Sequence, residues 1–263
     1  MDELKITKNS KLFALVLNIY NPKENFEIVK DYFKSENPSD LINSAQESGC
    51  DILGLRFNIQ NLEETPDAVE LLRKVLPLVT KPLMVCGVGK KELDEKLLPA
   101  LIKVLDRQCI ISFAAEDDYR AIVPEAVNGG HYVVLKTPID INLAKELNIL
   151  SIDLGLQKNK IIMNTDIGGL GYGFEYGYSM MEKVRLEGIK GDEYLDLPLL
   201  SDASTESLKT KEARVDSFSD SWGDLPKRAE MIELSACAGV LAAGANIITV
   251  NCPQNIKLLK GLV

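Results

Sequence analysis

Eight short apolar runs alternate with helical patterns from one end of this chain to the other. The runs lie at residues 12–18, 50–57, 81–87, 109–114, 131–137, 160–164, 193–201 and 245–251. They lack the strict polar–apolar alternation of half-exposed strands, as expected when both faces of a parallel sheet are buried. Eight such units in 263 residues predict an α/β fold, the TIM (β/α)8 barrel, with a doubly wound open sheet as the second possibility.

The chain is predicted to form one domain. No linker and no shift in composition divides residues 1–263, and 46% hydrophobic residues with 26% charged residues are ordinary for a globular protein. One connection stands out, because the polar stretch 202–226 is too long for an ordinary link between a strand and a helix. Loops of this length are commonly functional or mobile.

Charge and hydropathy exclude several classes of partner. A formal net charge of -9 argues against a nucleic-acid surface, which needs clustered lysine and arginine, and against an anionic lipid surface. No apolar run approaches the roughly 20 residues of a membrane span. The charged opening MDELKITKNSK is unlike a secretory signal. We therefore expect a cytoplasmic protein.

The cysteines and the single histidine point away from metal and triad chemistry. The five cysteines are widely spaced and never form a CxxC pair, so we expect buried, reduced thiols, with no iron–sulfur or zinc site. They are Cys50, Cys86, Cys109, Cys237 and Cys252. His131 is the only histidine, which argues against a Ser-His-Asp site or a multi-histidine metal site.

A glycine-rich loop follows the sixth apolar run. In NTDIGGLGYGFEYGY, the glycines at 168, 169, 171 and 173 let the backbone approach a ligand or partner closely, and their N–H groups could receive an anion. The spacing matches neither a dinucleotide fingerprint nor a P-loop. The alternative is a tight turn that packs the next helix on the barrel. Of the alternating aromatics from Tyr172 to Tyr178, we expect one or two to line the barrel mouth.

Polar side chains end most of the predicted strands. They are Asn18, Arg56, Asp140, Asn164, Asp166, Asp202 and Asn251. Each alone is readily explained as a helix cap or a turn residue. Together, amides and carboxylates at a barrel mouth without a basic cluster suit a polar uncharged ligand such as a pterin. Asp166 or Asp202 could protonate or orient a ring nitrogen, and no activated nucleophile and no catalytic residue is identified.

Three longer segments resemble one known family. Residues 137–150, 167–192 and 222–248 are similar to the small (delta) subunit of the corrinoid iron–sulfur protein of the acetyl-CoA synthase/decarbonylase system. The resemblance implies a barrel related to dihydropteroate synthase and to the pterin-dependent methyltransferases. Asn164-Thr165 and Asn251-Cys252 stand where members of that family usually have Asp-Pro and Arg-His.

The resemblance also implies a role in one-carbon metabolism, in the acetyl-CoA (Wood–Ljungdahl) pathway. A large partner subunit carries the iron–sulfur cluster, and a cobalamin shared with it takes a methyl group from methyltetrahydrofolate or a methyltetrahydropterin towards acetyl-CoA synthase. The residues expected to face the corrinoid, the pterin or the partner are Asn164, Thr165, Asp166, Gly168, Gly169, Gly171, Tyr172, Asp202 and Asn251.

Three functions remain open at this point. The first is a non-catalytic subunit of a corrinoid methyl-carrier complex. The second is a stand-alone pterin- or corrinoid-dependent methyltransferase. The third is a partner-binding barrel with a decayed site, in which case the 202–226 loop is the expected footprint of the partner. A homodimer is a further possibility, because apolar helix faces can close on a second copy.

Overall fold

Eight parallel strands form a nearly closed barrel, as predicted. The computed structural model describes residues 5–166 and 168–263. The strands are β1 (Leu12–Asn18), β2 (Ile52–Arg56), β3 (Leu83–Cys86), β4 (Ile110–Ala115), β5 (Tyr132–Lys136), β6 (Ile161–Asn164), β7 (Leu200–Ser201) and β8 (Ile247–Val250). They run in the order β6-β5-β4-β3-β2-β1-β8-β7. A single parallel bridge between Met163 and Leu199 joins the two ends of this order.

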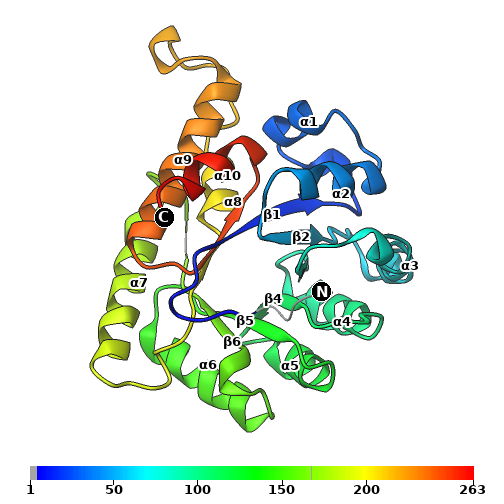
Figure 1. Cartoon of the computed structure of the whole chain (residues 1–263), viewed down its shortest axis with the longest axis vertical. Coiled ribbons are helices and arrows are strands. Elements are labelled where there is room, and N and C mark those ends of the chain that lie inside the picture. The colour runs from blue at the N-terminus through cyan, green and yellow to red at the C-terminus, as the bar shows by residue number, and fades with distance from the viewer. Residues whose placement is uncertain (1–4, 167) are drawn as a thin grey trace.

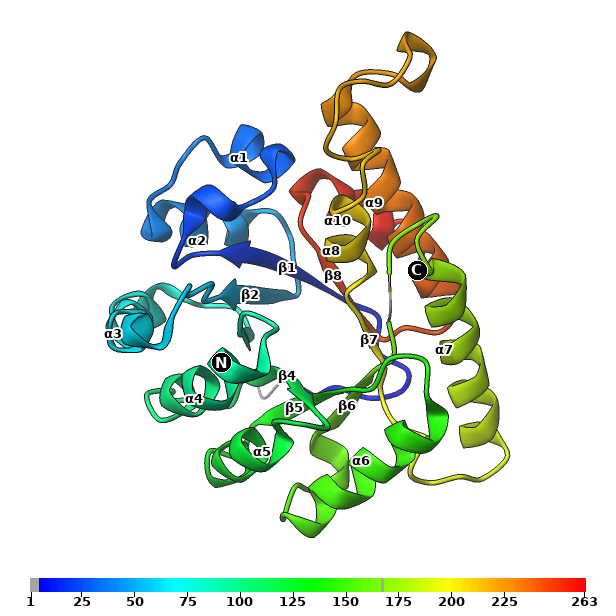
Figure 2. The same cartoon turned by 180° about the vertical axis from the view of Figure 1, so that it is seen from behind.

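Helices surround the barrel on the outside (Figures 1 and 2). They are α1 (Glu27–Phe33), α2 (Pro38–Glu47), α3 (Thr65–Val75), α4 (Lys91–Ile102), α5 (Tyr119–Asn128), α6 (Ile141–Asp153), α7 (Phe174–Ile189), α8 (Ala203–Leu208), α9 (Leu225–Ala242) and α10 (Pro253–Lys260). Short 3-10 turns add η1 (Pro22–Glu24), η2 (Leu62–Glu64), η3 (Leu76–Leu78), η4 (Lys158–Lys160) and η5 (Asp220–Trp222). None of the helices in the described ranges is long and apolar enough to cross a membrane.

The seventh strand is much shorter than the run that predicted it. Of residues 193–201, only Leu200 and Ser201 pair as a strand, with Ile247 and Ile248 of β8. Pro198 lacks an N–H and cannot donate to a ladder, and its carbonyl instead accepts from Met163 N at 2.8 Å. The segment before it turns, since Leu195 N and Asp196 N both donate to Asp192 O. The seam between β6 and β7 is therefore the least hydrogen-bonded part of the barrel.

The sequence predicts one long polar loop at residues 202–226, and the structure corrects this. Part of the segment is helical, and part is held in place by hydrogen bonds from α9. Its first residues form α8, and the remainder projects beside the start of α9 (Figures 1 and 2). Arg228 of α9 is buried and its guanidinium donates to the carbonyls of Glu212, Val215 and Gly223 at 2.6–2.9 Å. Because one side chain satisfies three loop carbonyls, the projecting segment has a defined path.

Two apolar layers account for the absence of alternation in the strands. One set of strand residues fills the barrel, including Ala14, Val16, Met84, Val134 and Ile247. The neighbouring residues in each strand point outward and pack under the helices, as Phe13, Leu15 and Leu17 do. Both faces of the sheet are buried, as is usual for parallel sheets. All five cysteines are free and buried, which confirms their expected place in the core.

His131 lies at the start of β5, at the opposite end of the barrel from the strand carboxyl ends. It is buried, its Nδ1 accepts from Cys109 N at 3.1 Å, and its Nε2 has no hydrogen-bond partner in the described part of the chain. Burial lowers the pKa of His131 to about 4, and the charge of Lys160 adds to this effect. The only histidine is thus a neutral structural residue.

This burial predicts a pH-dependent stability. The unfolded chain binds a proton at His131 near its ordinary pKa, whereas the native state stays neutral down to about pH 4. Stability should therefore fall as the pH drops from about 6.5 to about 4, by roughly 3 kcal/mol for this group. We expect His131→Asn to remove that slope, measured as the difference between variant and native urea unfolding free energies at pH 7.5 and pH 4.5. Equal differences at the two pH values would contradict this assignment.

Candidate functional site

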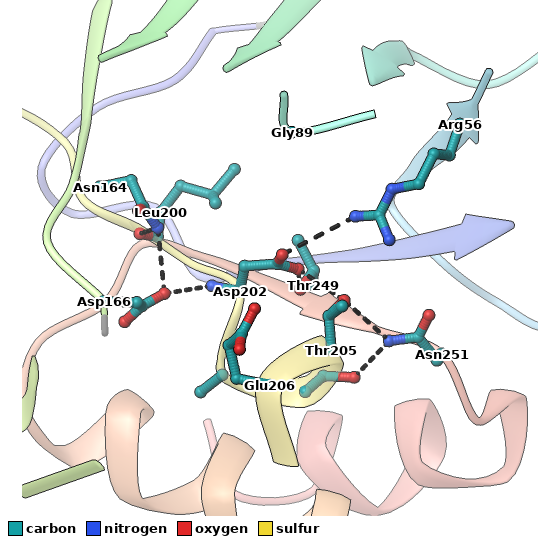
Figure 3. Close-up of polar contacts among 12 residues, drawn as sticks. Arg56, Gly89, Asn164, Asp166, Leu200, Asp202, Thr205, Glu206, Thr249 and Asn251 are labelled. Atoms are coloured by element: carbon teal, nitrogen blue, oxygen red, sulfur yellow. Dashed lines mark hydrogen bonds and ion pairs between the residues drawn. The ribbon is translucent and has the colours of Figure 1, made fainter. Parts of the chain in front are cut away.

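The carboxyl ends of the strands place a cluster of polar side chains at one mouth of the barrel (Figure 3). Asn164 ends β6, Asp166 lies two residues beyond it, and Asp202 follows β7. Arg56 ends β2 and Asn251 follows β8. Catalytic and binding groups of TIM barrels gather at this face, because every strand–helix loop opens there.

Asp166 connects the ends of β6 and β7. Its carboxylate accepts from Ser201 Oγ at 3.1 Å, from Asn164 Nδ2 at 3.0 Å and from the backbone N–H of Asp202. Asn164 Nδ2 also donates to Leu200 O at 3.1 Å. Three of these four bonds cross the seam at which the strand ladder is reduced to one bridge, and the bond between Asn164 and Asp166 stays on the β6 side. Side chains therefore replace the missing ladder at the mouth.

Burial raises the pKa of Asp166 to about 7. The negative charge of Asp202 acts in the same direction, while the bonds from Asp202 N, Ser201 and Asn164 oppose it. The carboxyl is thus protonated below neutral pH, although its three donors favour the ionised form.

Asp202 is the side chain at the centre of the cluster. Its Oδ1 accepts from Thr205 Oγ1 at 2.9 Å and from Thr249 Oγ1 at 2.5 Å. Its Oδ2 lies 3.7 Å from Arg56 Nη2, a long ion pair between largely buried side chains. Oδ2 is thus held in place with spare capacity to accept a hydrogen bond. Asn164 Oδ1, fully buried, has no partner among the described residues.

Asn251 is positioned by a second buried carboxylate, Glu233 of α9. Glu233 Oε1 accepts from Ser204 Oγ at 2.5 Å, from Asn251 N at 2.7 Å and from Cys252 N at 3.1 Å. Its Oε2 accepts from Asn255 Nδ2 at 2.7 Å. Burial raises the pKa of Glu233, and these bonds counteract the shift. The carboxylate fastens the start of α10 to α8 and α9, and it leaves Asn251 Nδ2 to bond Ser204 Oγ at 2.6 Å.

Two cavities open at this mouth. Asp202 lines the smaller one, and its partners Arg56 and Thr205 line the larger one. The smaller, of about 90 Å³, is lined by Lys136, Pro138, Asn164, Asp166, Asp202 and Glu206. The larger, of about 230 Å³, is lined by Val16, Asn18, Glu24, Asn25, Phe26, Arg56, Asn58, Val88, Thr205, Lys209 and Asn251. Three cations therefore face the mouth from three elements. The expectation of a mouth without a basic cluster needs this correction, because Lys136 and Lys209 join Arg56 there.

The glycine loop packs against α8. A Cβ on Gly169 would lie 2.5 Å from Ser207 Cα, and one on Gly168 would meet the carbonyl oxygen of Tyr172. Tyr172 N and Phe174 N both donate to Gly169 O, which makes a tight turn. Ile167, inside the same motif, lies outside the described residues. Close packing within the turn and against α8 thus accounts for glycine at 168 and 169. The place of these two residues in a ligand or partner site stays a prediction.

The remaining predicted residues occupy varied environments. Tyr172 is 53% exposed. Phe174 packs towards Gly239 of α9, so within the described residues neither mouth cavity has an aromatic from this loop in its wall. Thr165 is buried and its Oγ1 has no partner among the described residues. Asp140 is a helix cap that accepts from Asn142 N and Leu143 N at the start of α6.

Comparison with known proteins places the chain in a family. Residues 5–236 match the family model of the CO dehydrogenase/acetyl-CoA synthase delta subunit. The chain belongs to this family. The acetyl-CoA decarbonylase/synthase complex subunit delta of Methanocaldococcus jannaschii is 30% identical over 196 residues, which cover 74% of this chain and 48% of that protein. Its counterpart in Archaeoglobus fulgidus is 30% identical over 237 residues, or 86% of this chain and 52% of that protein.

The family expected from the three motifs is thereby confirmed, and the chain spans about half the length of the curated relatives that it matches. Among solved structures, the dihydropteroate synthase of Xanthomonas albilineans with 4-aminobenzoic acid superposes with a TM-score of 0.66 at 13% identity. That match covers 98% of this chain and 93% of the synthase. At this identity the match establishes the fold, and it confirms the predicted dihydropteroate synthase-like barrel.

The packing of the glycine loop predicts a selective loss of stability. Gly169→Ala would press a methyl group into the backbone of α8, which cannot move aside as a flexible side chain can. We expect a loss of about 1–3 kcal/mol in urea unfolding. Gly171→Asn is the matched control, since Gly171 has a φ of +75° with open space around it, and asparagine tolerates that conformation. Equal losses in the two variants would argue against close packing at Gly169.

Asp166 predicts a pH effect opposite in sign to that of His131. The native state keeps the Asp166 proton up to about pH 7, whereas the unfolded chain releases it near the ordinary value of 3.8. The native state thus binds more protons across this range, and its stability falls as the pH rises, by on the order of 4 kcal/mol. We expect the Asp166→Asn variant to lack this slope. Its unfolding free energy relative to that of the native protein should therefore be most favourable at pH 7.5 and least favourable at pH 4.5. A pH-independent difference in unfolding free energy would contradict the raised pKa.

Proposed function

We propose that this chain is the barrel component of a cytoplasmic corrinoid methyl-carrier complex of the acetyl-CoA decarbonylase/synthase type. In this proposal its mouth holds the pterin ring of methyltetrahydrofolate or a methyltetrahydropterin, and a large partner subunit carries the corrinoid and the iron–sulfur cluster. The observation that carries the pterin site is the pair of available acceptors, Asn164 Oδ1 and Asp202 Oδ2, in one small cavity.

The chemistry of a pterin matches these acceptors. One edge of its aminopyrimidinone ring presents a ring N–H and an exocyclic amino group, which are adjacent donors. A buried amide oxygen without a partner is costly in the free protein, so a ligand that supplies a donor gains the full value of that bond. Asn164 and Asp202 would hold the donor edge, and the ring would extend into the larger cavity beside Arg56 and Asn251.

Each of the surrounding groups has a defined part in this site. The two threonines hold the Asp202 carboxylate and Asp166 holds the Asp202 backbone N–H, so that the free carboxylate oxygen is oriented before the ligand binds. Arg56 keeps a positive charge 3.7 Å from that oxygen. A corrinoid bound by the partner would supply the acceptor for the methyl group. The barrel's own contribution is to bind and orient the donor, and no side chain here is assigned a covalent step.

The names of the relatives support the proposal that this chain works within a complex, because both relatives are named as subunits of one. The stand-alone methyltransferase remains the second candidate, supported by the same pterin-binding geometry. The two differ in one measurable respect: only an enzyme in its own right would transfer a methyl group from the pterin to free cobalamin in the absence of a partner.

Calorimetric titration of the purified protein with methyltetrahydrofolate and then with cobalamin tests the site. We expect the pterin to bind and Asp202→Asn to weaken it by roughly tenfold or more, since a hydrogen bond to a charged group is lost. Asp140→Asn is the control, being the same change at an exposed helix cap on α6. Absence of heat with the pterin would overturn the pterin site and favour a barrel that only binds a partner.

A further inference from the structure

A long groove lies beside the barrel mouth, between the η1–α1 segment on one side and α8 with the start of α9 on the other. Its volume is about 680 Å³, within the range of roughly 300–1,000 Å³ that is usual for ligand sites. The larger mouth cavity, of about 230 Å³, falls below that range. A ligand with a ring in the mouth and a long substituent therefore needs further space.

The groove adjoins the larger mouth cavity. Glu24, Asn25 and Phe26 line both the groove and the larger mouth cavity. Asn25 is buried at this junction, where its side chain accepts from Asn18 N at 2.8 Å and donates to Asn18 O at 2.9 Å. The wall shared by the two spaces is thus fixed to the end of β1 through Asn25, and it is formed before any ligand binds.

The groove combines an apolar floor with cations on opposite walls. Its apolar lining comes from both sides, with Phe26 and Ile28 facing Leu208, Leu225 and Pro226. Lys23 lies on the η1 wall and Arg214 on the loop after α8.

Neither of these two cations forms an ion pair within the described ranges. Three carboxylates also line the η1–α1 wall. Glu27 is paired with Lys30 at 2.6 Å, and Glu24 accepts from Gln60 at 2.9 Å. The third, Asp31, forms no ion pair within the described ranges and lies on the same side of the groove as Lys23.

We propose that this groove is the subsite for the tail of the pterin, an aryl spacer that ends in anionic groups. The aryl ring lies on the apolar floor near Phe26 and Pro226, and the terminal anion lies between Lys23 and Arg214. This inference rests on the proposed pterin site in the mouth. It assigns the groove to the same ligand and makes the tail, as well as the ring, a determinant of affinity.

Calorimetry with three ligands tests the tail subsite separately from the mouth. They are methyltetrahydrofolate, the methanogenic methyltetrahydropterin and a tail-less 5,6-dimethyltetrahydropterin. We expect the tailed ligands to bind roughly tenfold or more tightly than the tail-less ring. Arg214→Gln and Lys23→Gln should each weaken the tailed ligands by roughly threefold, as for partly exposed charges, and leave the tail-less ring unchanged. Of the two tailed ligands, the one whose terminal anion is better matched to Lys23 and Arg214 should lose more affinity on these substitutions.

Lys211→Gln is the control, since Lys211 is an exposed lysine in the same loop and outside the groove wall. Equal binding of tailed and tail-less ligands, with no effect of Arg214→Gln or Lys23→Gln, would overturn the tail subsite and leave the mouth site intact. Failure of all three ligands to bind would overturn both proposals. An equal loss with Lys211→Gln would show only general charge attraction and would also overturn the subsite.

Discussion

The buried carboxylate of Asp166 holds together the weakest part of this barrel. Around most of the ring, neighbouring strands share a ladder of several residues, but β6 and β7 are joined by a single bridge. Asp166 accepts three hydrogen bonds there, two of them from the end of β7. An ionisable group in so dry a place is stable only because every bond it needs is supplied locally. The same hydrogen bonds of Asp166 therefore close the barrel and position the polar groups of the mouth.

The same principle recurs at the next strand. Glu233 is fully buried on α9 and satisfies two backbone N–H groups at the start of α10, together with Ser204 and Asn255. These two carboxylates determine where α8 begins and where β8 ends. Asp202 and Asn251, which are proposed to contact a ligand, are thus held by Asp166 and Glu233, which are assigned no ligand contact. Such support keeps Asp202 and Asn251 in fixed orientations, which reduces the cost of ordering them on binding.

Much of the architecture could be predicted because it depends on local patterns. Strands buried on both faces leave continuous apolar runs, and those runs located every strand, while three motifs identified the family. Short elements were harder. The expected strand at 193–201 shrinks to two residues because Pro198 and the turn at Asp192 break it. In α8, four of six residues are alanine, serine or threonine, so the segment has no helical apolar stripe and its sequence predicts a loop.

The sequence by itself determined the barrel, the family and five members of the mouth cluster, since polar residues at strand ends must meet at one face of a parallel barrel. These five are Arg56, Asn164, Asp166, Asp202 and Asn251. Only the tertiary structure decided which of their atoms remain available. Thr249 lies 47 residues from Asp202 in sequence, and Glu233 lies 18 residues from Asn251. Their hydrogen bonds occupy some polar atoms of the cluster and leave others unpaired. The groove beside the mouth is likewise a product of packing, because its two walls come from segments almost 200 residues apart, and no local pattern records the distance between them.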